Sequence, residues 1–421
     1  MASESGENTA RLPWERGAQF ANLESKTSRK ALAFTRHVRY VLGRTAMSGI
    51  TIRIQNFRAL TQFVWSPEEV CLLSGANGSG KTTTLDALRF LQSVFTHGHE
   101  AAFQRVSGRY FKRREAPAEE PVEFEVEVDK LRWKLRFPMS PTGLKGTFGE
   151  ELHYDGQVKL RVGMFDDSWF LGKERLDLDQ TRCCSRVLWD RGSAPWMQPL
   201  VDALNGIRVY DSYWLNQVKR SQPVDSHDSY LHGTGKNLWS VLSTWQGSPT
   251  RYQGRFRWVL ERAREAFPGQ ISSIEFDRGL PYLYRPGATD PADGLPPERA
   301  ADGLLTGLLH LTAVAGAQAG AIVAFDEMEN HLHPHAIRRI LAAFRDLADE
   351  NDLTVIVTSH SPVVMNTFKG EEDQFFVLER QNGGPVPKAL SKLHDSDWLV
   401  HYALGDLYER EEFASPRDGT D

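Results

Sequence analysis

Hydrophobic and polar positions near the start of the chain predict a strand, a second strand and then a helix. "ITIRIQNF" (50–57) alternates in polarity and is rich in isoleucine, which indicates a strand with one buried face. "VCLLSG" (70–75) is a continuous apolar run that ends at a glycine, which favours a strand buried on both faces. From residue 82 to about residue 94, leucines recur at helical spacing, so a glycine-rich segment lies between a strand and a helix.

The middle of the chain has a different pattern. Residues 120 to about 190 hold alternating segments separated by Gly, Pro and Asp turns, which predicts an antiparallel β region with one buried face. Residues 235–246 and 254–267 are expected to be helices, and the Pro/Gly-rich stretch 279–298 is expected to be a loop.

The last third alternates between helices and apolar strands. We expect an apolar helix over 303 to about 319, a strand over 321–327, an amphipathic helix over 334 to about 349, and a strand over 353–359. The fold class predicted from the whole pattern is α/β, with a mixed or parallel core sheet, an antiparallel β-rich lobe and an inserted helical lobe.

These patterns divide the chain into an extension, a head and a tail. Residues 26–44 are basic and hold no acidic residue, which is compatible with an arm that binds nucleic acid. We favour an unstructured extension, or a translation start at Met47. The expected divisions are 1–47 (extension), 48–413 (head, made of 48–119, the β-rich 120–230, the helical 231–300 and 301–413) and 414–421 (tail).

Composition narrows the class of protein. The chain has 421 residues, is 40% hydrophobic and 25% charged, and carries a formal net charge of -5, as expected for a globular protein that is not a polycation. It has no apolar run of about 18 residues and no signal-peptide core, so no membrane span is expected. Its three cysteines show no metal or disulfide spacing, which favours the cytoplasm.

The glycine-rich segment carries the strongest chemical signal. "GANGSGKT" fits the pattern G-x-x-x-x-G-K-[ST], whose backbone N–H groups surround nucleotide phosphates. Lys81 would supply charge to the outer phosphates and Thr82 a hydroxyl to Mg²⁺. The candidate nucleotide-binding residues here are Gly75, Ala76, Asn77, Gly78, Ser79, Gly80, Lys81, Thr82 and Thr83.

Two later strands end in polar residues that complete such a site. "AIVAFDE" ends in Asp326 and Glu327, and a pair of acids at the end of a buried strand is costly without a cation. Asp326 is the expected Mg²⁺ ligand, and Glu327 can orient or deprotonate a water molecule. "TSHSP" ends the following strand, and from there His360 could reach the terminal phosphate.

The order of these segments resembles the ATPase heads of the ABC type, and among them the RecF, SMC and OLD branch. "DEMENHLHPHAIRRI", "VIVTSHSPVVMNTF", "HGTGKNLWSVL" and "WLVHYALGDLYEREEF" are similar to blocks of OLD-like stand-alone ATPases. The resemblance implies an ATP- and Mg²⁺-dependent ATPase whose two copies enclose ATP. It assigns catalysis to Lys81, Glu327 and His360, and the signature turn that acts on the partner's ATP to Asp302 and Gly303.

The resemblance also has departures and rivals. Ala301 stands where the family has its signature serine, Met328 replaces a proline, and the family's Mg²⁺-sensing glutamine could be Gln92 or Gln104. No Toprim nuclease follows "LGDLYEREEF", so an effector such as that nuclease is expected in trans, in DNA repair or phage defence. The alternatives are a transporter ATPase subunit and a nucleotide-dependent scaffold with little hydrolysis.

Two further segments invite a functional interpretation. "RVSGRYFKRR" (105–114) mixes basic and aromatic residues, which suits either nucleic-acid contacts or a solvated loop. "HLHPH" (331–335) suggests a metal site, but the match to the family's loop and Pro334 at a helix start favour a structural role.

Overall fold

The computed structural model of the chain places most of residues 49–414. The structure describes residues 49–106, 111–140, 143–144, 148–162, 169–171, 174–176, 182–220, 222–224, 227–248, 250–379, 384–395, 398–399 and 401–414. Gly49–Asp421 forms one compact unit, and the expected extension 1–47 with its candidate start Met47 lies outside the described residues.

A six-stranded sheet carries the glycine-rich loop and both polar strand ends. Its order is β12-β15-β16-β3-β17-β18, and all neighbours are parallel except β17 and β18. Its strands are β3 (Val70–Ser74), β12 (Arg208–Tyr210), β15 (Ile322–Phe325), β16 (Thr354–Thr358), β17 (Phe375–Glu379) and β18 (Val386–Ala389).

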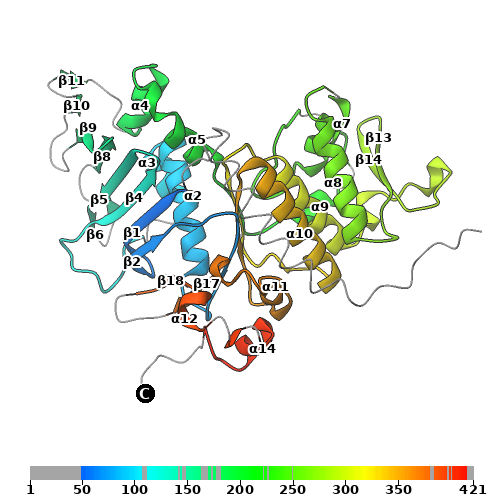
Figure 1. Ribbon diagram of the computed structural model, residues 1–421. Helices are drawn as coiled ribbons and strands as arrows, with labels where there is room; N and C mark the ends of the chain where they lie inside the picture. Colours follow the sequence, from blue (N-terminus) through cyan, green and yellow to red (C-terminus); the bar gives the residue numbers. More distant parts are fainter. Residues whose placement is uncertain are drawn as a thin grey trace, which may run out of the picture. The chain divides into compact units, whose positions relative to one another are not determined.

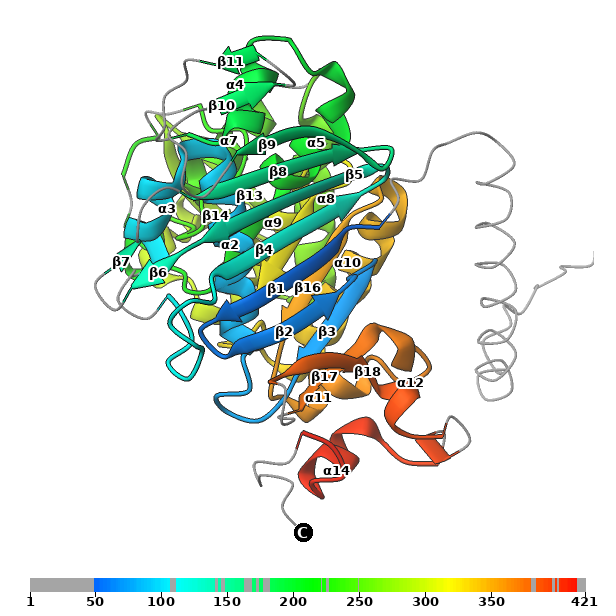
Figure 2. The same ribbon diagram turned by 90° about the vertical axis from the view of Figure 1, so that its left-hand side faces the viewer.

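An eight-stranded antiparallel sheet forms a second layer, with the order β11-β10-β9-β8-β5-β4-β1-β2. Figure 2 shows its strands side by side, facing the viewer. They are β1 (Thr51–Phe57), β2 (Leu60–Trp65), β4 (Val122–Val128), β5 (Leu131–Phe137), β8 (Gly149–Tyr154), β9 (Gln157–Val162), β10 (Trp169–Leu171) and β11 (Glu174–Leu176). Because β4 pairs with β1, the β-rich region continues the sheet that the first strand begins.

Helices cover both faces of the parallel sheet (Figure 1). The helix after the glycine-rich loop, α2 (Lys81–His97), packs in one core with the antiparallel sheet. The other principal helices are α3 (His99–Val106), α4 (Cys184–Asp190), α5 (Gln198–Gly206), α6 (Leu215–Val218), α7 (Leu238–Gly247), α8 (Gln253–Ala266), α9 (Asp302–Ala315), α10 (Pro334–Asn351), α11 (Pro362–Asn366), α12 (Leu390–Leu393) and α14 (Leu404–Glu409).

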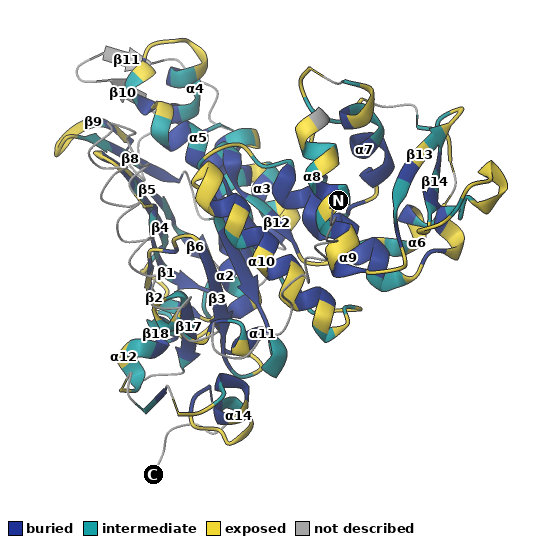
Figure 3. Ribbon diagram, turned by 45° about the vertical axis from the view of Figure 1, so that its right-hand side comes forward, coloured by how far each residue is buried: buried dark blue, intermediate teal, exposed yellow. Residues whose placement is uncertain are grey.

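The two hydrophobic cores meet at the parallel sheet, because successive strand residues point to opposite faces. In β15, Ile322 and Ala324 belong to the core that contains α2, whereas Val323 and Phe325 belong to the core that contains α9 and α10. All four side chains are buried, which explains why this strand is apolar throughout its length. Strand β3 of the same sheet is likewise buried throughout, and Figure 3 shows it in dark blue. The predicted α/β class, with a mixed core sheet and an antiparallel β-rich region, is confirmed.

One sequence prediction is wrong in part. The stretch 279–298 was expected to be a loop, but Leu280–Tyr284 forms strand β14, which pairs with β13 (Ser273–Asp277). Arg278 and Gly279 both have positive φ, 49° and 82°, and so make a tight hairpin turn. The strand alternates between buried and half-buried residues, but the prolines in this stretch favoured a loop in the sequence prediction. None of the described helices has the length and hydropathy that a membrane span requires.

Candidate functional site: a phosphate loop and two strand-end carboxylates

The glycine-rich loop joins β3 to α2 in a conformation that needs glycine. Gly78 and Gly80 have φ values of 76° and 109°, in the left-handed region that side chains disfavour. The Lys81 side chain turns back over the loop, and its ammonium donates to the carbonyl oxygens of Gly75 at 2.7 Å and Ala76 at 3.2 Å. Burial lowers the pKa of Lys81, although the carboxylates of Asp326 and its neighbours act in the opposite direction.

The remaining loop residues differ in exposure. Asn77 and Thr82 are exposed and Thr83 is half-buried, whereas Ser79 is buried and its hydroxyl has no hydrogen-bond partner among the described residues. The N-terminus of α2 has no acidic side chain in its first turn and no side-chain cap. Its N–H groups and positive end are therefore open to an anion.

The order of the sheet brings the two polar strand ends to this loop. β16 pairs with β3 on one side and with β15 on the other, all three in parallel, so their carboxyl ends lie at the same edge. The Thr82 hydroxyl donates to Oδ2 of Asp326 at 2.9 Å. Residues from the first and last thirds of the chain thus form one oxygen-rich site.

Thr358, which ends β16, joins the two carboxylate residues. Its hydroxyl donates to Oδ1 of Asp326 and accepts the backbone N–H of Glu327 at 2.9 Å. Both Asp326 carboxylate oxygens therefore have hydroxyl partners, which fixes the carboxylate plane. Thr358 was not among the predicted site residues, although it is the first residue of the "TSHSP" segment that suggested His360.

Glu327 leaves the strand in a sharp turn. Its φ of 47° lies in the left-handed region, which is uncommon for a side chain other than Asn, Asp or Gly. Its Oε2 accepts from the Asn330 amide at 3.1 Å. Asp326, Glu327 and Asn330 line a pocket of about 140 Å³, together with Tyr210, Asp211, Ser212, Tyr213, Leu215, Thr306, His310 and His331. Glu327 thus faces a space that can hold water.

His360 lies just beyond β16 and has two hydrogen-bonding partners. Its backbone N–H donates to Oε1 of Glu329 at 3.0 Å, and its Nδ1 lies 2.8 Å from the hydroxyl of Tyr408. Burial, and then the positive charge of Lys81, lower the pKa of His360. Burial raises the pKa of Glu329, whose Oε2 has no partner among the described atoms. Neither Glu329 nor Tyr408 was predicted, since only their spatial position marks them.

The candidate signature turn, residues 301–303, lies at the start of α9 and is far in sequence from the glycine-rich loop. Ala301 is the exposed N-cap residue and makes no side-chain cap. Asp302 forms an ion pair of 2.5 Å with Lys219. A side chain at Gly303 would approach the carbonyl oxygen of His331 to 2.6 Å, so only glycine fits there. The close contacts of the turn are thus with Lys219 and His331.

In the other two segments, several of the described residues contact other parts of the chain. Nδ1 of His333 accepts the backbone N–H of His335 and so caps α10, and no group of metal-ligating side chains is found among the described residues. In the basic segment, residues 107–110 lie outside the described residues. Phe111 is 1% exposed and so is not available for base stacking, and Lys112 donates to the carbonyl oxygen of Pro117 at 2.6 Å. Arg114 is exposed, and nucleic-acid binding by this segment stays a prediction.

Comparison with known proteins supports the nucleotide site. Residues 71–169 and 288–366 match a family described as "AAA domain, putative AbiEii toxin, Type IV TA system". These segments contain the whole loop of residues 75–83, both carboxylates and His360. No curated protein sequence is similar enough to the chain to count as a match.

Solved structures of SMC heads are similar to most of the chain. One is an SMC head bound to the C-winged helix domain of ScpA, with a TM-score of 0.48, 13% identity and coverage of 82% of this chain and 99% of that chain. The SMC head domain from Thermotoga maritima has a TM-score of 0.44 at 11% identity, covering 82% and 98%. An Smc head with an extended coiled coil, bound to the C-terminal domain of ScpA from Pyrococcus furiosus, has 0.44 at 13%, covering 85% and 100%.

Because these TM-scores are below 0.5, we assign the fold from the sheet order described above and not from these superpositions. That order places a phosphate loop, a strand-end carboxylate pair and a polar strand end between them at one edge of a parallel sheet. The family match covers the segments that supply them. The two segments that build the candidate site are therefore distant in sequence, and both lie within the match to the AAA-domain family.

Proposed function

We propose that the chain is an ABC-type ATPase that binds and hydrolyses ATP with Mg²⁺, and that ATP closes two copies into a homodimer. The observation that carries the proposal is the array of Thr82, Asp326, Thr358 and Glu327, in which a hydroxyl on the phosphate-loop helix is hydrogen-bonded to a strand-end carboxylate. Such an array fits nucleotide phosphates on one side and hydrolytic water on the other.

The donor set fits Mg²⁺, which prefers oxygen ligands and is bound in nucleotide sites by one or two carboxylates plus phosphates. The Thr82 hydroxyl and the Asp326 carboxylate would hold the ion, and their oxygens are already within 2.9 Å of each other. When bound, Mg²⁺ would neutralise charge on the phosphates. Lys81, which is desolvated and hydrogen-bonded to the loop, is suited to contact the outer phosphates.

Glu327 is the candidate general base. It lines the pocket of about 140 Å³, and its left-handed backbone places it in the turn that follows β15. The amide of Asn330 holds one carboxylate oxygen at 3.1 Å, which restricts the side chain. His360 lies on the neighbouring strand end, and its Nδ1 contact with Tyr408 orients the ring so that Nε2 can donate to a terminal phosphate.

The position of the candidate signature turn supports the proposed homodimer. Ala301 is exposed, and the contacts of Asp302 and Gly303 are with Lys219 and His331 rather than with the phosphate loop. A second copy could therefore receive this turn against its own bound ATP. By resemblance to OLD-like ATPases, the cycle would regulate a DNA-related process, in repair or phage defence, through DNA itself or an effector in trans such as a Toprim nuclease.

The proposal is tested by nucleotide binding, phosphate release and sedimentation of three variants with ATP and Mg²⁺. Lys81→Ala should abolish ATP binding, and Glu327→Gln should keep ATP binding, lose hydrolysis and accumulate the dimer. Glu350→Gln, an exposed carboxylate on α10, is the matched control and should behave as the parent. Hydrolysis by Glu327→Gln at the parental rate would remove Glu327 as the base. A parent that dimerises without hydrolysis would be a nucleotide-dependent scaffold.

A further inference from the structure

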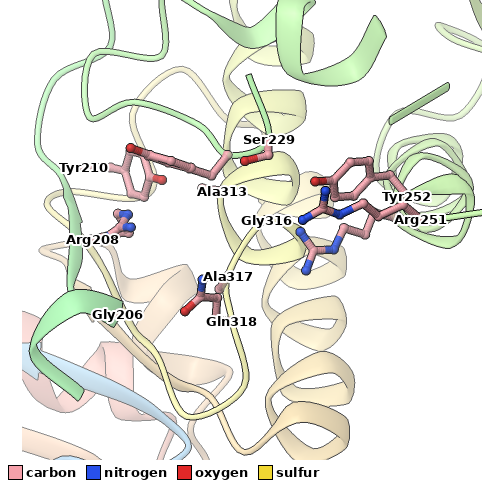
Figure 4. A pocket seen from close by; sticks show the side chains of 12 residues that line it. Gly206, Arg208, Tyr210, Ser229, Arg251, Tyr252, Ala313, Gly316, Ala317 and Gln318 are labelled. Carbon is pink, nitrogen blue, oxygen red and sulfur yellow. The ribbon is translucent and has the colours of Figure 1, made fainter. Parts of the chain in front are cut away.

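A second pocket, outside the nucleotide site, is lined by three arginines. It has a volume of about 230 Å³ and lies where the end of α9, the start of α8 and strand β12 meet. Arg208 belongs to β12, Arg251 precedes α8 and Arg255 lies in its first turn. In Figure 4, Arg208 lies on one side of the pocket and Arg251 on the other, with Ser229 and Gln318 between them.

The side chains that line this pocket carry positive charge and no negative charge. No acidic residue is among those that line it: Gly206, Arg208, Tyr210, Ser229, Tyr230, Arg251, Tyr252, Arg255, Ala313, Gly316, Ala317 and Gln318. Among the described residues, no carboxylate forms an ion pair with Arg208, Arg251 or Arg255. Three cations therefore line one pocket, and no carboxylate in the described part of the chain pairs with them.

Arg255 is a half-buried cation with aromatic neighbours. Its side chain is half-buried, and burial lowers the pKa of its guanidinium. It lies 5.7 Å from the ring centre of Tyr252 and 5.8 Å from that of Trp245, so aromatic faces support it in place of carboxylates. A half-buried cation whose side-chain partners among the described residues are ring faces keeps its N–H donors available for an anion that enters the pocket.

The aromatic residues prearrange the other two arginines. Arg208 lies 4.9 Å from the ring centre of Tyr230 and donates to the carbonyl oxygens of Asn205 and Ile207. Arg251 lies 5.1 Å from the ring centre of Tyr252. A planar guanidinium stacked on a ring loses less conformational freedom when it binds phosphate oxygens, which it can do with two parallel hydrogen bonds.

We propose that this pocket binds a small phosphorylated ligand, with the phosphate held by Arg251 and Arg255, which both lie beside Tyr252, and with Arg208 contacting the ligand from the opposite side. The polar side chains of Ser229 and Gln318 would contact the remainder of the ligand, and the volume suits a compound of the size of pyrophosphate or a nucleoside monophosphate. The site is distinct from the phosphate loop, because none of its lining residues belongs to residues 75–83.

The pocket is connected to the carboxylates through β12. Tyr210 lines both this pocket and the smaller one beside Glu327, and its carbonyl oxygen accepts the backbone N–H of Asp326 at 2.9 Å. A ligand bound against Arg208 and Tyr210 would thus contact β12, whose last residue accepts the backbone N–H of Asp326. Binding should therefore slow hydrogen exchange of the Asp326 amide, whether or not the protein hydrolyses ATP.

The test uses the full chain carrying Lys81→Ala, so that the phosphate loop does not compete for the probe. Titration calorimetry with pyrophosphate and with AMP should show binding, whereas adenosine, which lacks phosphate, should not bind. Adding Arg255→Gln should weaken binding about 10-fold to 150-fold, as expected for the loss of a charge-assisted hydrogen bond. Arg257→Gln, an exposed arginine on the same helix, is the matched control and should leave the affinity unchanged.

Thermal unfolding of each variant shows whether it is folded, and Arg208→Gln provides a second variant from a different element. The inference is overturned if neither probe binds, or if both arginine variants bind as well as Arg257→Gln. It is also overturned if the pocket variants weaken only the binding of a single-stranded oligonucleotide, which would make this an electrostatic nucleic-acid surface. Failure of the ATPase would leave these binding results unaffected.

Discussion

Nε2 of His310 lies 3.0 Å from the carbonyl oxygen of Met328, and so α9, which begins at the signature turn, is bonded to the loop after the two carboxylates. A carbonyl only accepts, so Nε2 carries the proton. Nδ1 then accepts from the Tyr213 hydroxyl, 2.9 Å away. His310 is thus a neutral, buried link between the helix that begins at the candidate signature turn and the loop that follows the two carboxylates.

The first prediction concerns the pH dependence of stability. Burial lowers the pKa of His310 to about 4, below its usual value near 6.5. As pH falls from about 6.5 to about 4, His310 binds a proton in the unfolded chain but stays neutral in the folded protein. The free energy of unfolding therefore decreases in this pH range. His310→Gln can keep both hydrogen bonds without titrating. Between pH 7 and pH 4.5 it should lose about 2–3 kcal/mol less unfolding free energy than the parent.

Urea unfolding of the parent and the variant at both pH values checks this prediction. All other titrating groups are shared, so the comparison isolates His310. If the two proteins lose the same free energy between pH 7 and pH 4.5, His310 either titrates normally or is not buried as described.

The second prediction concerns Thr358, which holds Asp326 and the Glu327 N–H together. Thr358→Val leaves both polar groups without their partner, whereas Thr358→Ser keeps the hydroxyl. Because changes to groups that orient metal ligands cost about 10-fold to 100-fold in metal affinity or activity, the valine variant should need more Mg²⁺ for ATP hydrolysis. The serine variant should remain near the parent.

The measurement is the ATPase rate as a function of Mg²⁺ concentration. Thr354→Val, at the other end of the same strand, is the control. Thr354 pairs with β15 through its backbone, and its N–H donates to the carbonyl oxygen of Ala321, so the substitution keeps these bonds. A valine variant with the parental Mg²⁺ dependence would show that Thr358 does not orient the metal ligand.

The third prediction concerns a buried carboxylate in the β-rich region. Glu150 is fully buried and accepts from Nε1 of Trp133 at 2.7 Å, from the N–H of Cys184 at 2.7 Å, and from the N–H and hydroxyl of Ser185. It thereby ties the start of α4 to β5. Burial raises the pKa of Glu150, although these donors favour its charged form.

Glu150→Gln places an amide N–H₂ among groups that are all donors, so at least one donor is left without an acceptor. We expect a loss of about 3 kcal/mol in the free energy of unfolding, measured by chemical denaturation at neutral pH. Glu151→Gln, whose side chain forms ion pairs near the surface, should cost less than about 1 kcal/mol. Equal losses for the two variants would contradict the structural role assigned to Glu150.

Sequence patterns predicted the elements of the sheet edge because those segments are strongly constrained. The strand before the phosphate loop is buried on both faces, so it is apolar throughout, and its following glycines are required by backbone conformation. His310 gave no such signal, since a single histidine in the apolar helix "GLLHLTAV" shows nothing of its two partners. The arginine pocket was equally hidden: Arg208, Arg251 and Arg255 lie on separate elements and converge only in the fold.

The last prediction concerns the signature turn, where Ala301 occupies the position of a serine in the ATPases that the chain resembles. As the N-cap of α9, Ala301 offers no side-chain acceptor to the first turn of the helix. Ala301→Ser has two expected effects. Its hydroxyl can cap α9, worth about 1 kcal/mol in stability, and it can donate to the terminal phosphate bound by a second copy.

Ala301→Asp separates these effects, because aspartate caps a helix as well as serine does but repels a phosphate. Both variants should unfold at a higher temperature than the parent. In the Glu327→Gln background, with ATP and Mg²⁺, only Ala301→Ser should tighten the dimer, by about 10-fold to 150-fold for a hydrogen bond to a charged group. Sedimentation gives the dimer constants, and ATP affinity at concentrations where the protein is monomeric should not change. If serine stabilises the fold but leaves dimerisation as it was, residues 301–303 do not meet the nucleotide of a second copy.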